Sequence, residues 1–123
     1  MTDKLQIGVL GLSHDHVWSN VQTLVERNDA ELVGAAEPRE ELRRKFRNEF
    51  EIDAFADSES LLGNEKLDAV YIFSSNRDGA SLAIAAAERG LHVLIEKPMA
   101  ASLDQADAML AAARRNNVRL MIN

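Results

Sequence analysis

The sequence predicts an α/β domain in which helices cover both faces of a doubly wound parallel sheet. Short apolar runs, typical of buried strands, alternate with amphipathic helical stretches along all 123 residues, and this alternation is typical of parallel sheets. No linker, low-complexity tract or internal repeat interrupts the pattern. The length is also close to that of one domain, so we expect a single domain over residues 1–123.

The first half of the chain is expected to contain three strands and three helices. The strands are predicted at residues 5–10, 32–36 and 52–56, and the helices at residues 15–28, 38–50 and 58–62. The second helix has an apolar stripe of Leu42, Phe46 and Phe50 at helical spacing. Pro38 favours the first turn of this helix, where its preset backbone angle is tolerated.

The second half is expected to contain three strands and two helices. The strands are predicted at residues 68–73, 91–95 and 118–122, and the helices at residues 80–89 and 103–113. Gly90 favours the end of the alanine-rich helix, and Ser102 with Gln105 can form a capping box before the last helix. The apolar stripe of the last helix is predicted to comprise Leu103, Ala106, Leu110 and Ala113.

Composition disfavours several classes of function. The formal net charge of −6 disfavours nucleic acids and anionic membranes as partners, because both require clustered Lys and Arg. The chain has no cysteine, which excludes disulfides, thiolate chemistry and zinc–thiolate sites. Neither a signal peptide nor a long apolar span is evident, so we expect a cytoplasmic protein.

The turn after the first strand is the candidate pyrophosphate loop. A dinucleotide fold needs a turn here that lets backbone N–H groups approach a pyrophosphate at a helix N-terminus. The usual G-x-G-x-x-G pattern keeps only its first glycine, with a serine and a histidine at the other two positions. We therefore expect a remodelled or shortened loop. The residues expected to contact the cofactor are Gly11, Leu12, Ser13, His14 and His16.

His14 and His16 flank an acid, an arrangement that suggests a metal site. Zinc sites usually need three or four ligands, and the neighbouring sequence supplies no others. The alternative is that Ser13 or Asp15 caps the following helix while one histidine donates to a phosphate or to a neighbour. We expect no metal here.

Acidic side chains follow two of the predicted strands. Glu37 ends the second strand, where a carboxylate can bond both ribose hydroxyls of an adenosine and repels a 2′-phosphate. NAD is therefore expected rather than NADP, although Arg39 weakens this preference. Glu96 and Lys97 end the fifth strand, which places them at the edge of the sheet where ligands bind.

Together these motifs resemble the N-terminal NAD(P)-binding domain of the glucose–fructose oxidoreductase / inositol dehydrogenase (Gfo/Idh/MocA-like) family. The similarity lies in residues 7–11, 68–72, 103–113 and 90–98, the last containing Gly-x-His-Val and Glu-Lys-Pro. It covers essentially the whole chain. The resemblance implies a three-layer Rossmann fold with strand order 3-2-1-4-5-6, and hydride transfer between NAD(P) and a sugar, polyol or related compound.

The resemblance also assigns roles to residues. Lys97 matches the catalytic lysine that contacts substrate near the nicotinamide and assists proton transfer, and Glu96 matches the acid that helps to place the cofactor. The Lys97–Pro98 peptide bond is cis in the family.

Two segments depart from the family pattern. One is the loop after the first strand, which lacks two of its three glycines, and the other follows the fourth strand. Members usually carry Thr-Pro-x-x-x-His after the fourth strand, whereas this chain places Gly79 at the histidine position. Ser74, Ser75 and Asn76 are nevertheless expected to line the cofactor with hydroxyl and amide groups.

In the family a second α/β domain supplies the substrate pocket and an acid/base histidine. The chain ends where that domain would begin, so we expect a truncated form that binds NAD(H) and turns over little or nothing by itself. Hydride transfer needs both reactants held together, and a sugar or polyol would bind only if a second domain were supplied. A homo-oligomer is compatible with this expectation.

Two other classes fit the outline. A flavodoxin-like phosphoacceptor receiver domain has similar length and a Lys-Pro after its fifth strand, and Asp57 would be the acceptor. Its Mg²⁺ needs paired acids after the first strand, where only Asp15 occurs. The other class is a non-catalytic Rossmann module that dimerises through apolar surface left by an absent domain.

Overall fold

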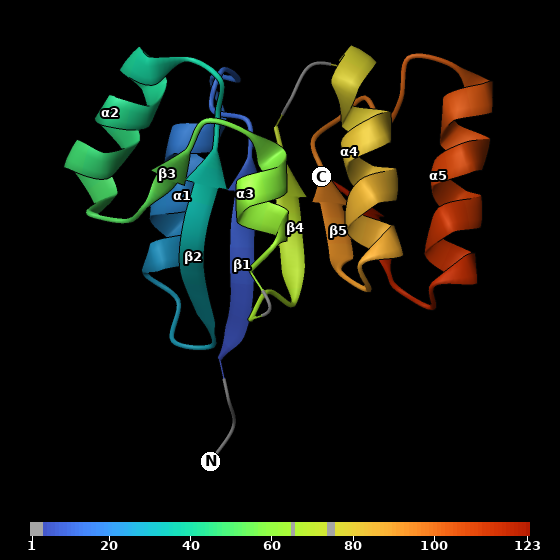
Figure 1. The fold of residues 1–123 in the computed structure, drawn as a ribbon, viewed down its shortest axis with the longest axis horizontal. Helices are drawn as coiled ribbons and strands as arrows, with labels where there is room; N and C mark the ends of the chain where they lie inside the picture. The colour runs from blue at the N-terminus through green and yellow to red at the C-terminus, as the bar shows by residue number, and fades with distance from the viewer. Residues whose placement is uncertain (1–3, 65, 74–75) are drawn as a thin grey trace.

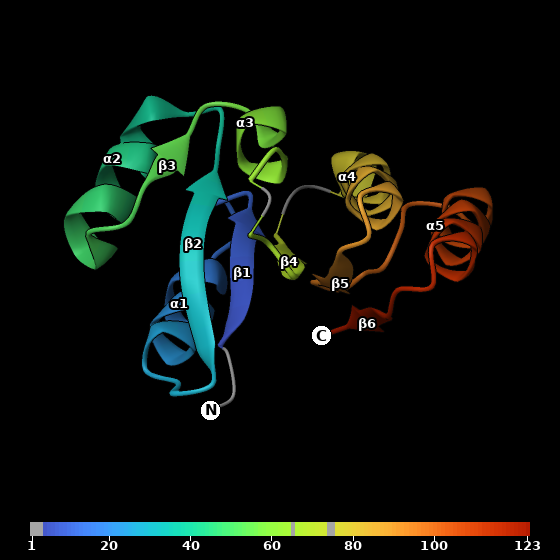
Figure 2. The ribbon, with the colours of Figure 1, turned by 60° about the horizontal axis from the view of Figure 1, so that its bottom comes forward.

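The computed structural model describes residues 4–64, 66–73 and 76–123, which form a six-stranded parallel sheet flanked by helices (Figure 1). The strands are β1 (Leu5–Leu10), β2 (Ala30–Ala36), β3 (Ala54–Phe55), β4 (Ala69–Ile72), β5 (His92–Ile95) and β6 (Leu120–Ile122). The helices are α1 (Val17–Val25), α2 (Glu40–Phe50), α3 (Ser58–Leu62), α4 (Asn76–Glu88) and α5 (Leu103–Arg115). The sheet order β3-β2-β1-β4-β5-β6 confirms the predicted topology (Figure 2).

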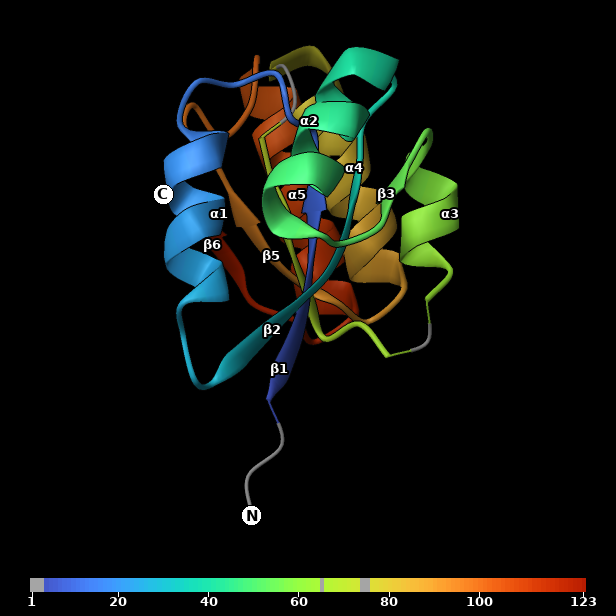
Figure 3. The same ribbon diagram turned by 90° about the vertical axis from the view of Figure 1, so that its left-hand side faces the viewer.

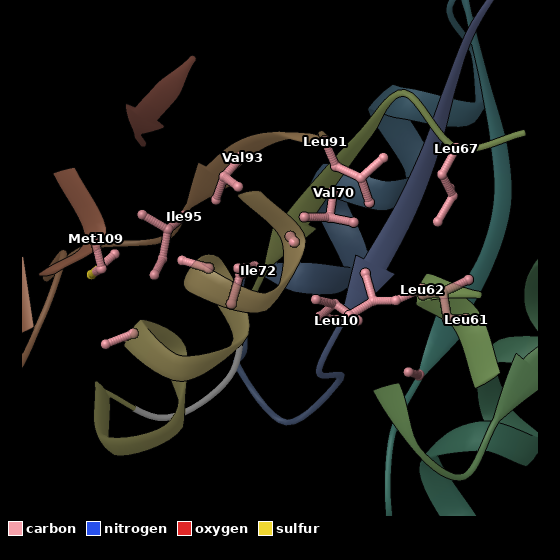
Figure 4. Close-up of a cluster of buried hydrophobic side chains, with 14 residues drawn as sticks. Leu10, Leu61, Leu62, Leu67, Val70, Ile72, Leu91, Val93, Ile95 and Met109 are labelled. Carbon is pink, nitrogen blue, oxygen red and sulfur yellow. The ribbon is translucent and has the colours of Figure 1, made fainter. Parts of the chain in front are cut away.

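Apolar side chains on both faces of the sheet hold the three layers together. On one face, Val9 and Ala35 pack with Val17 of α1 and Phe46 of α2. The opposite face is covered by α3, α4 and α5, and its core runs from Leu61 through the central strands to Met109 (Figure 4). Figure 3 shows α1 and α3 on opposite sides of the sheet. Strands buried on both faces explain the continuous apolar runs in the sequence.

Helix α2 begins later than the sequence predicts, so the placement of Pro38 in its first turn is wrong. Arg39 is the N-cap with an extended backbone, and Pro38 therefore lies before the helix. The Arg43 guanidinium donates hydrogen bonds to the carbonyl oxygens of Glu37 and Pro38, at 2.9 and 2.7 Å. These contacts hold the segment extended until Glu40, where the helix starts.

The predicted apolar stripe of α5 is also partly wrong. Leu103 is 83% exposed and Leu110 is 39% exposed, whereas Met109 and Ala112 are buried. Helix α5 packs against the alanine-rich α4, and the residues that α5 buries are Met109, Ala112 and Ala113. Half of the predicted capping box is present, because Ser102 Oγ accepts a hydrogen bond from the Gln105 N–H. The Gln105 side chain accepts its hydrogen bond from the Ala101 N–H instead of the Ser102 N–H.

None of the helices in the described residues combines the length and the apolar character needed to cross a bilayer.

Candidate functional site

The carboxyl ends of the parallel strands meet at one edge of the sheet, which is where ligands bind in open α/β folds. A cleft of about 440 Å³ opens there. Its lining includes Gly11 and Ser13 after β1, Glu37 and Arg39 after β2, and Asp57 after β3. The structure therefore brings the loop after β1 and the predicted ribose-binding acid to one cavity.

The backbone of the loop after β1 is tied to β2. Gly11 has a positive φ of 93°, a conformation that glycine adopts without strain. Its N–H donates to the Ala36 carbonyl oxygen at 2.8 Å. Leu12 is buried, and its N–H donates to Glu37 Oε1 at 2.8 Å. The first glycine of the pattern is thus required by the turn itself.

Glu37 is buried and hydrogen-bonded at both carboxylate oxygens, which its place in the sequence does not predict. Its exposure is 3%, and its second oxygen, Oε2, accepts a hydrogen bond from the Arg39 N–H at 2.9 Å. One carboxylate therefore joins the loop after β1 to the turn before α2, which offsets the cost of burying a charge. Because each carboxylate oxygen has two lone pairs, Glu37 can still accept hydrogen bonds from a ribose.

The segment before α1 shows how the loop accommodates a histidine at the third glycine position. Helix α1 begins only at Val17, and His16 is its N-cap without a side-chain cap. The His16 side chain is 60% exposed, so it does not enter the space between helix and strand. Neither Ser13 nor Asp15 caps the helix; instead, His14 Nδ1 accepts a hydrogen bond from the His16 N–H at 3.1 Å.

A second buried carboxylate, Glu96, follows β5 and is 7% exposed. Its Oε2 accepts a hydrogen bond from Asn123 Nδ2 at 2.9 Å, and the same amide nitrogen donates to Tyr71 Oη. Burial, together with the charge of Glu96, raises the pKa of Tyr71 to about 12. Sequence reasoning missed Tyr71 and Asn123, although both belong to strand ends at this edge of the sheet.

The fold also brings to the two histidines a third side chain with a possible ligand atom, which the neighbouring sequence does not supply. Glu96 Oε1 lies 3.6 Å from His16 Nδ1. His14, His16 and Glu96 each offer one ligand atom, and these atoms lie within 4.8 Å of one another. Glu96 lies about 80 residues from the two histidines along the chain, so only the topology reveals the cluster.

The remaining predicted site residues follow β4 and β5. Lys97 is exposed, and the Lys97–Pro98 bond is cis, as the family resemblance implies. Ser74 and Ser75 lie outside the described residues, and of Asn76 the structure describes only its place at the start of α4.

Gly79, at the position of the family histidine, lies against β5. A Cβ atom there would approach Ile95 Cδ1 to 3.1 Å, so any side chain would press on this contact. A side chain at this position would therefore require Ile95 to shift by a few tenths of an ångström.

Asp57 has a structural role that argues against a receiver domain. It is the N-cap of α3, and its Oδ1 accepts hydrogen bonds from the Ser60 N–H and hydroxyl, both at 2.8 Å. These bonds lower the pKa of Asp57. The observed sheet has six strands, one more than the receiver plan, so the receiver interpretation is wrong.

Comparisons with known proteins agree with this geometry. Residues 5–123 match a family described as "Oxidoreductase family, NAD-binding Rossmann fold". The chain is 36% identical to D-xylose 1-dehydrogenase (NADP(+)) 2 from Haloferax volcanii, over 95% of this chain and 36% of that protein. It is 29% identical to myo-inositol 2-dehydrogenase from Thermotoga maritima, over 94% of this chain and 35% of that protein.

A solved structure shows the same fold. The 3-ketoreductase from Actinomadura kijaniata, in complex with TDP-benzene and NADP, matches with a TM-score of 0.90 and 28% identity. The match covers 98% of this chain and 38% of that one. The chain thus spans about a third of the length of these three relatives.

Proposed function

Because this chain belongs to the oxidoreductase family with an NAD-binding Rossmann fold, we propose that it forms the cofactor half of a dehydrogenase that acts on a sugar, a polyol or a related compound. The observation that carries this proposal is the link between Glu37 and the Leu12 N–H beside the cleft. It combines a glycine turn after β1 with an acid after β2, which is the arrangement that a dinucleotide requires.

The proposed cofactor is NAD rather than NADP. A 2′-phosphate at the end of β2 would approach Glu37, whose charge is buried and therefore little screened by solvent. Arg39 lines the same cleft, and its positive charge reduces the expected difference in affinity between NAD and NADP. The relative from Haloferax volcanii carries NADP(+) in its name, so the choice between the cofactors requires a measurement on this chain.

We place the nicotinamide end of the cofactor near Glu96 and Lys97. Gly11, Leu12, Ser13, His14 and His16 would contact the cofactor at the loop, with Ser74, Ser75 and Asn76 as further contacts. Lys97 is exposed beside a buried acid, and it would contact the substrate and assist proton transfer. Hydride transfer needs both reactants at close distance, so turnover would require a second domain.

The other expectations on partners and location complete the proposal. The protein would act in the cytoplasm, bind neither nucleic acid nor membrane, and be able to form a homo-oligomer. The 123 residues by themselves would bind NAD(H) and turn over little or no substrate.

Calorimetric titration of the purified chain with NADH and NADPH tests the cofactor assignment. We expect saturable binding that is tighter for NADH than for NADPH. The Glu37→Gln variant should bind NADH more weakly, so that its affinities for NADH and NADPH are closer to each other. Glu41→Gln, at an exposed position on α2, is the matched control and should bind like the wild type. Absence of binding by either nucleotide would refute the proposal, and tighter binding of NADPH would refute the NAD preference.

A further inference from the structure

We propose that His14, His16 and Glu96 form a binding site for a divalent transition-metal ion, with zinc as the best match. The site lies where β1 and β5 end, outside the cleft lined by Glu37. It shares its three side chains with the nicotinamide end of the proposed cofactor site. Its ligand atoms lie within 4.8 Å of one another. The inference rests on these side chains alone and does not depend on nucleotide binding.

The spacing of the ligand atoms is close to that of a zinc site. Zinc bonds to imidazole nitrogen and carboxylate oxygen are about 2.0–2.2 Å long, so ligand atoms in a tetrahedral site lie roughly 3.3 Å apart. His16 Nδ1 and Glu96 Oε1 are separated by 3.6 Å, which is already near this value. The His14 ring would have to move by no more than about an ångström or two to complete the set.

The environment of Glu96 suits a metal ligand. Its side chain is 5% exposed, and Asn123 holds its Oε2 atom by a hydrogen bond. The other oxygen, Oε1, therefore remains directed toward His16. Ligating carboxylates are typically oriented by such outer hydrogen bonds. The exposed His16 ring provides a route for an ion from solvent and the freedom to adjust.

The hydrogen bond at His14 predicts a structural signature of binding. His14 Nδ1 accepts a hydrogen bond from the His16 N–H, so the proton of a neutral ring resides on Nε2. An ion bound at Nδ1 would displace this bond, and an ion bound at Nε2 would require the proton to move to Nδ1. In both cases the backbone N–H of His16 loses its acceptor, which changes its amide resonance.

The donor set indicates the class of ion and leaves one position open. Two imidazoles and one carboxylate favour zinc and its neighbours over magnesium or calcium, which prefer oxygen ligands. Three protein ligands leave a fourth tetrahedral position for water or for an oxygen atom of a small molecule. Lys97 follows Glu96 directly, so this open position lies near the end of β5.

Titration with zinc in the absence of nucleotide tests the proposal. The purified, tag-free chain would be titrated with Zn²⁺ by calorimetry, and with Co²⁺ by its visible absorption, which reports coordination by nitrogen and oxygen. We expect one ion per chain and no comparable binding of Mg²⁺. His16→Ala and Glu96→Gln should each weaken zinc binding about tenfold or more.

The chain offers a matched control in its third histidine. His92 Nδ1 accepts a hydrogen bond from the Arg119 N–H at 3.0 Å, as His14 does from His16, but His92 does not belong to the cluster. His92→Asn should therefore bind zinc like the wild type. Because the His16 side chain is exposed, its replacement should leave the chain folded, and the circular dichroism spectrum of each variant would verify this.

Each outcome either supports or overturns the proposal. Equal zinc affinity of the wild type and His16→Ala, or an unchanged His16 amide resonance on zinc addition, would overturn it and leave a hydrogen-bonded cluster only. Because no nucleotide is present, failure to bind zinc leaves the cofactor proposal intact. Likewise, failure to bind NADH leaves the zinc result intact.

Discussion

Two buried carboxylates stand at the edge of the sheet where the strands end, and they are held in different ways. In the part of the chain that the structure describes, Glu37 and Glu96 are the buried charged residues, with 3% and 7% exposure. Backbone N–H groups hold both oxygens of Glu37, whereas side chains surround Glu96. The difference implies a rigid end and an adaptable end of the proposed cofactor site.

The physical reason is the mobility of the donors. The N–H groups that bind Glu37 belong to turns that the sheet and α2 fix in place, so this carboxylate cannot move without disturbing the fold. The partners of Glu96 are the exposed side chains of Asn123 and His16, which can rotate or exchange with water. A ligand can therefore rearrange the Glu96 end at low cost but must fit the Glu37 end as it stands.

Replacement of Glu37 should have the largest effect. Glu37→Ala leaves the N–H groups of Leu12 and Arg39 without their acceptors, and we expect a loss of about 3 kcal/mol in the free energy of unfolding. Urea denaturation measures this loss. Glu41→Ala, on an exposed position of α2, is the control and should cost less than about 0.5 kcal/mol. Equal losses in both variants would show that Glu37 does not anchor the loop.

The single tyrosine reports directly on the Glu96 end. Burial and then the charge of Glu96 raise the pKa of Tyr71 to about 12, while the hydrogen bond from Asn123 lowers it. The folded-state pKa exceeds the unfolded value of about 10. The stability that Tyr71 contributes is therefore fully present below pH 10 and is lost as the pH rises toward 12. Ultraviolet titration of this one tyrosine measures the shift.

A Glu96→Gln variant sharpens the same measurement. Without the negative charge the pKa of Tyr71 should fall but remain above its ordinary value, because burial contributes first. A tyrosine that titrates near 10 in the wild type would contradict the described environment of Glu96.

Loss of Asn123 should have a smaller effect than loss of Glu37. Asn123→Ala removes the hydrogen bonds to Tyr71 and Glu96, but Asn123 is exposed, and water can take its place. We expect a loss of about 1 kcal/mol in the free energy of unfolding. If Asn123→Ala lost as much unfolding free energy as Glu37→Ala, the Glu96 end of the site would be as rigidly held as the Glu37 end, contrary to the proposed difference between them.

Replacement of His16 should have the smallest effect on stability. Its side chain is 60% exposed and lies 3.6 Å from Glu96, and exposed pairs of this kind contribute less than about 1 kcal/mol. His16→Ala should therefore unfold within about 0.5 kcal/mol of the wild type. Thermal unfolding followed by circular dichroism would detect a larger change, which would assign the histidine a structural role.

Local patterns in the sequence are sufficient to predict the order of the elements but not the partners of the key residues. The apolar runs predict each strand, and the position of Glu37 after the second strand is evident. The sequence does not show that Glu37 accepts hydrogen bonds from Leu12 and Arg39, because hydrogen bonds between turns depend on how the strands align. The association of His14 and His16 with Glu96 likewise depends on β1 and β5 ending at the same edge.

The buried face of α5 shows a further limit of sequence patterns. The predicted stripe includes Leu103 and Leu110, which the structure leaves exposed, whereas its member Ala113 is buried. Alanines carry a weak hydropathy signal, yet Ala112 and Ala113 are buried together with Met109. The position of a residue on the helix therefore decides its burial here, and the size of its apolar side chain does not.

The most direct test of a single dinucleotide site with two unlike ends is a comparison of backbone amide shifts on addition of NADH and of AMP. We predict that NADH shifts the resonances of residues 11–16 and of Glu96 and Lys97 with one common affinity. AMP should shift only those near Gly11 and Glu37. Shifts by NADH confined to one end, or absent from the loop after β1, would contradict the account.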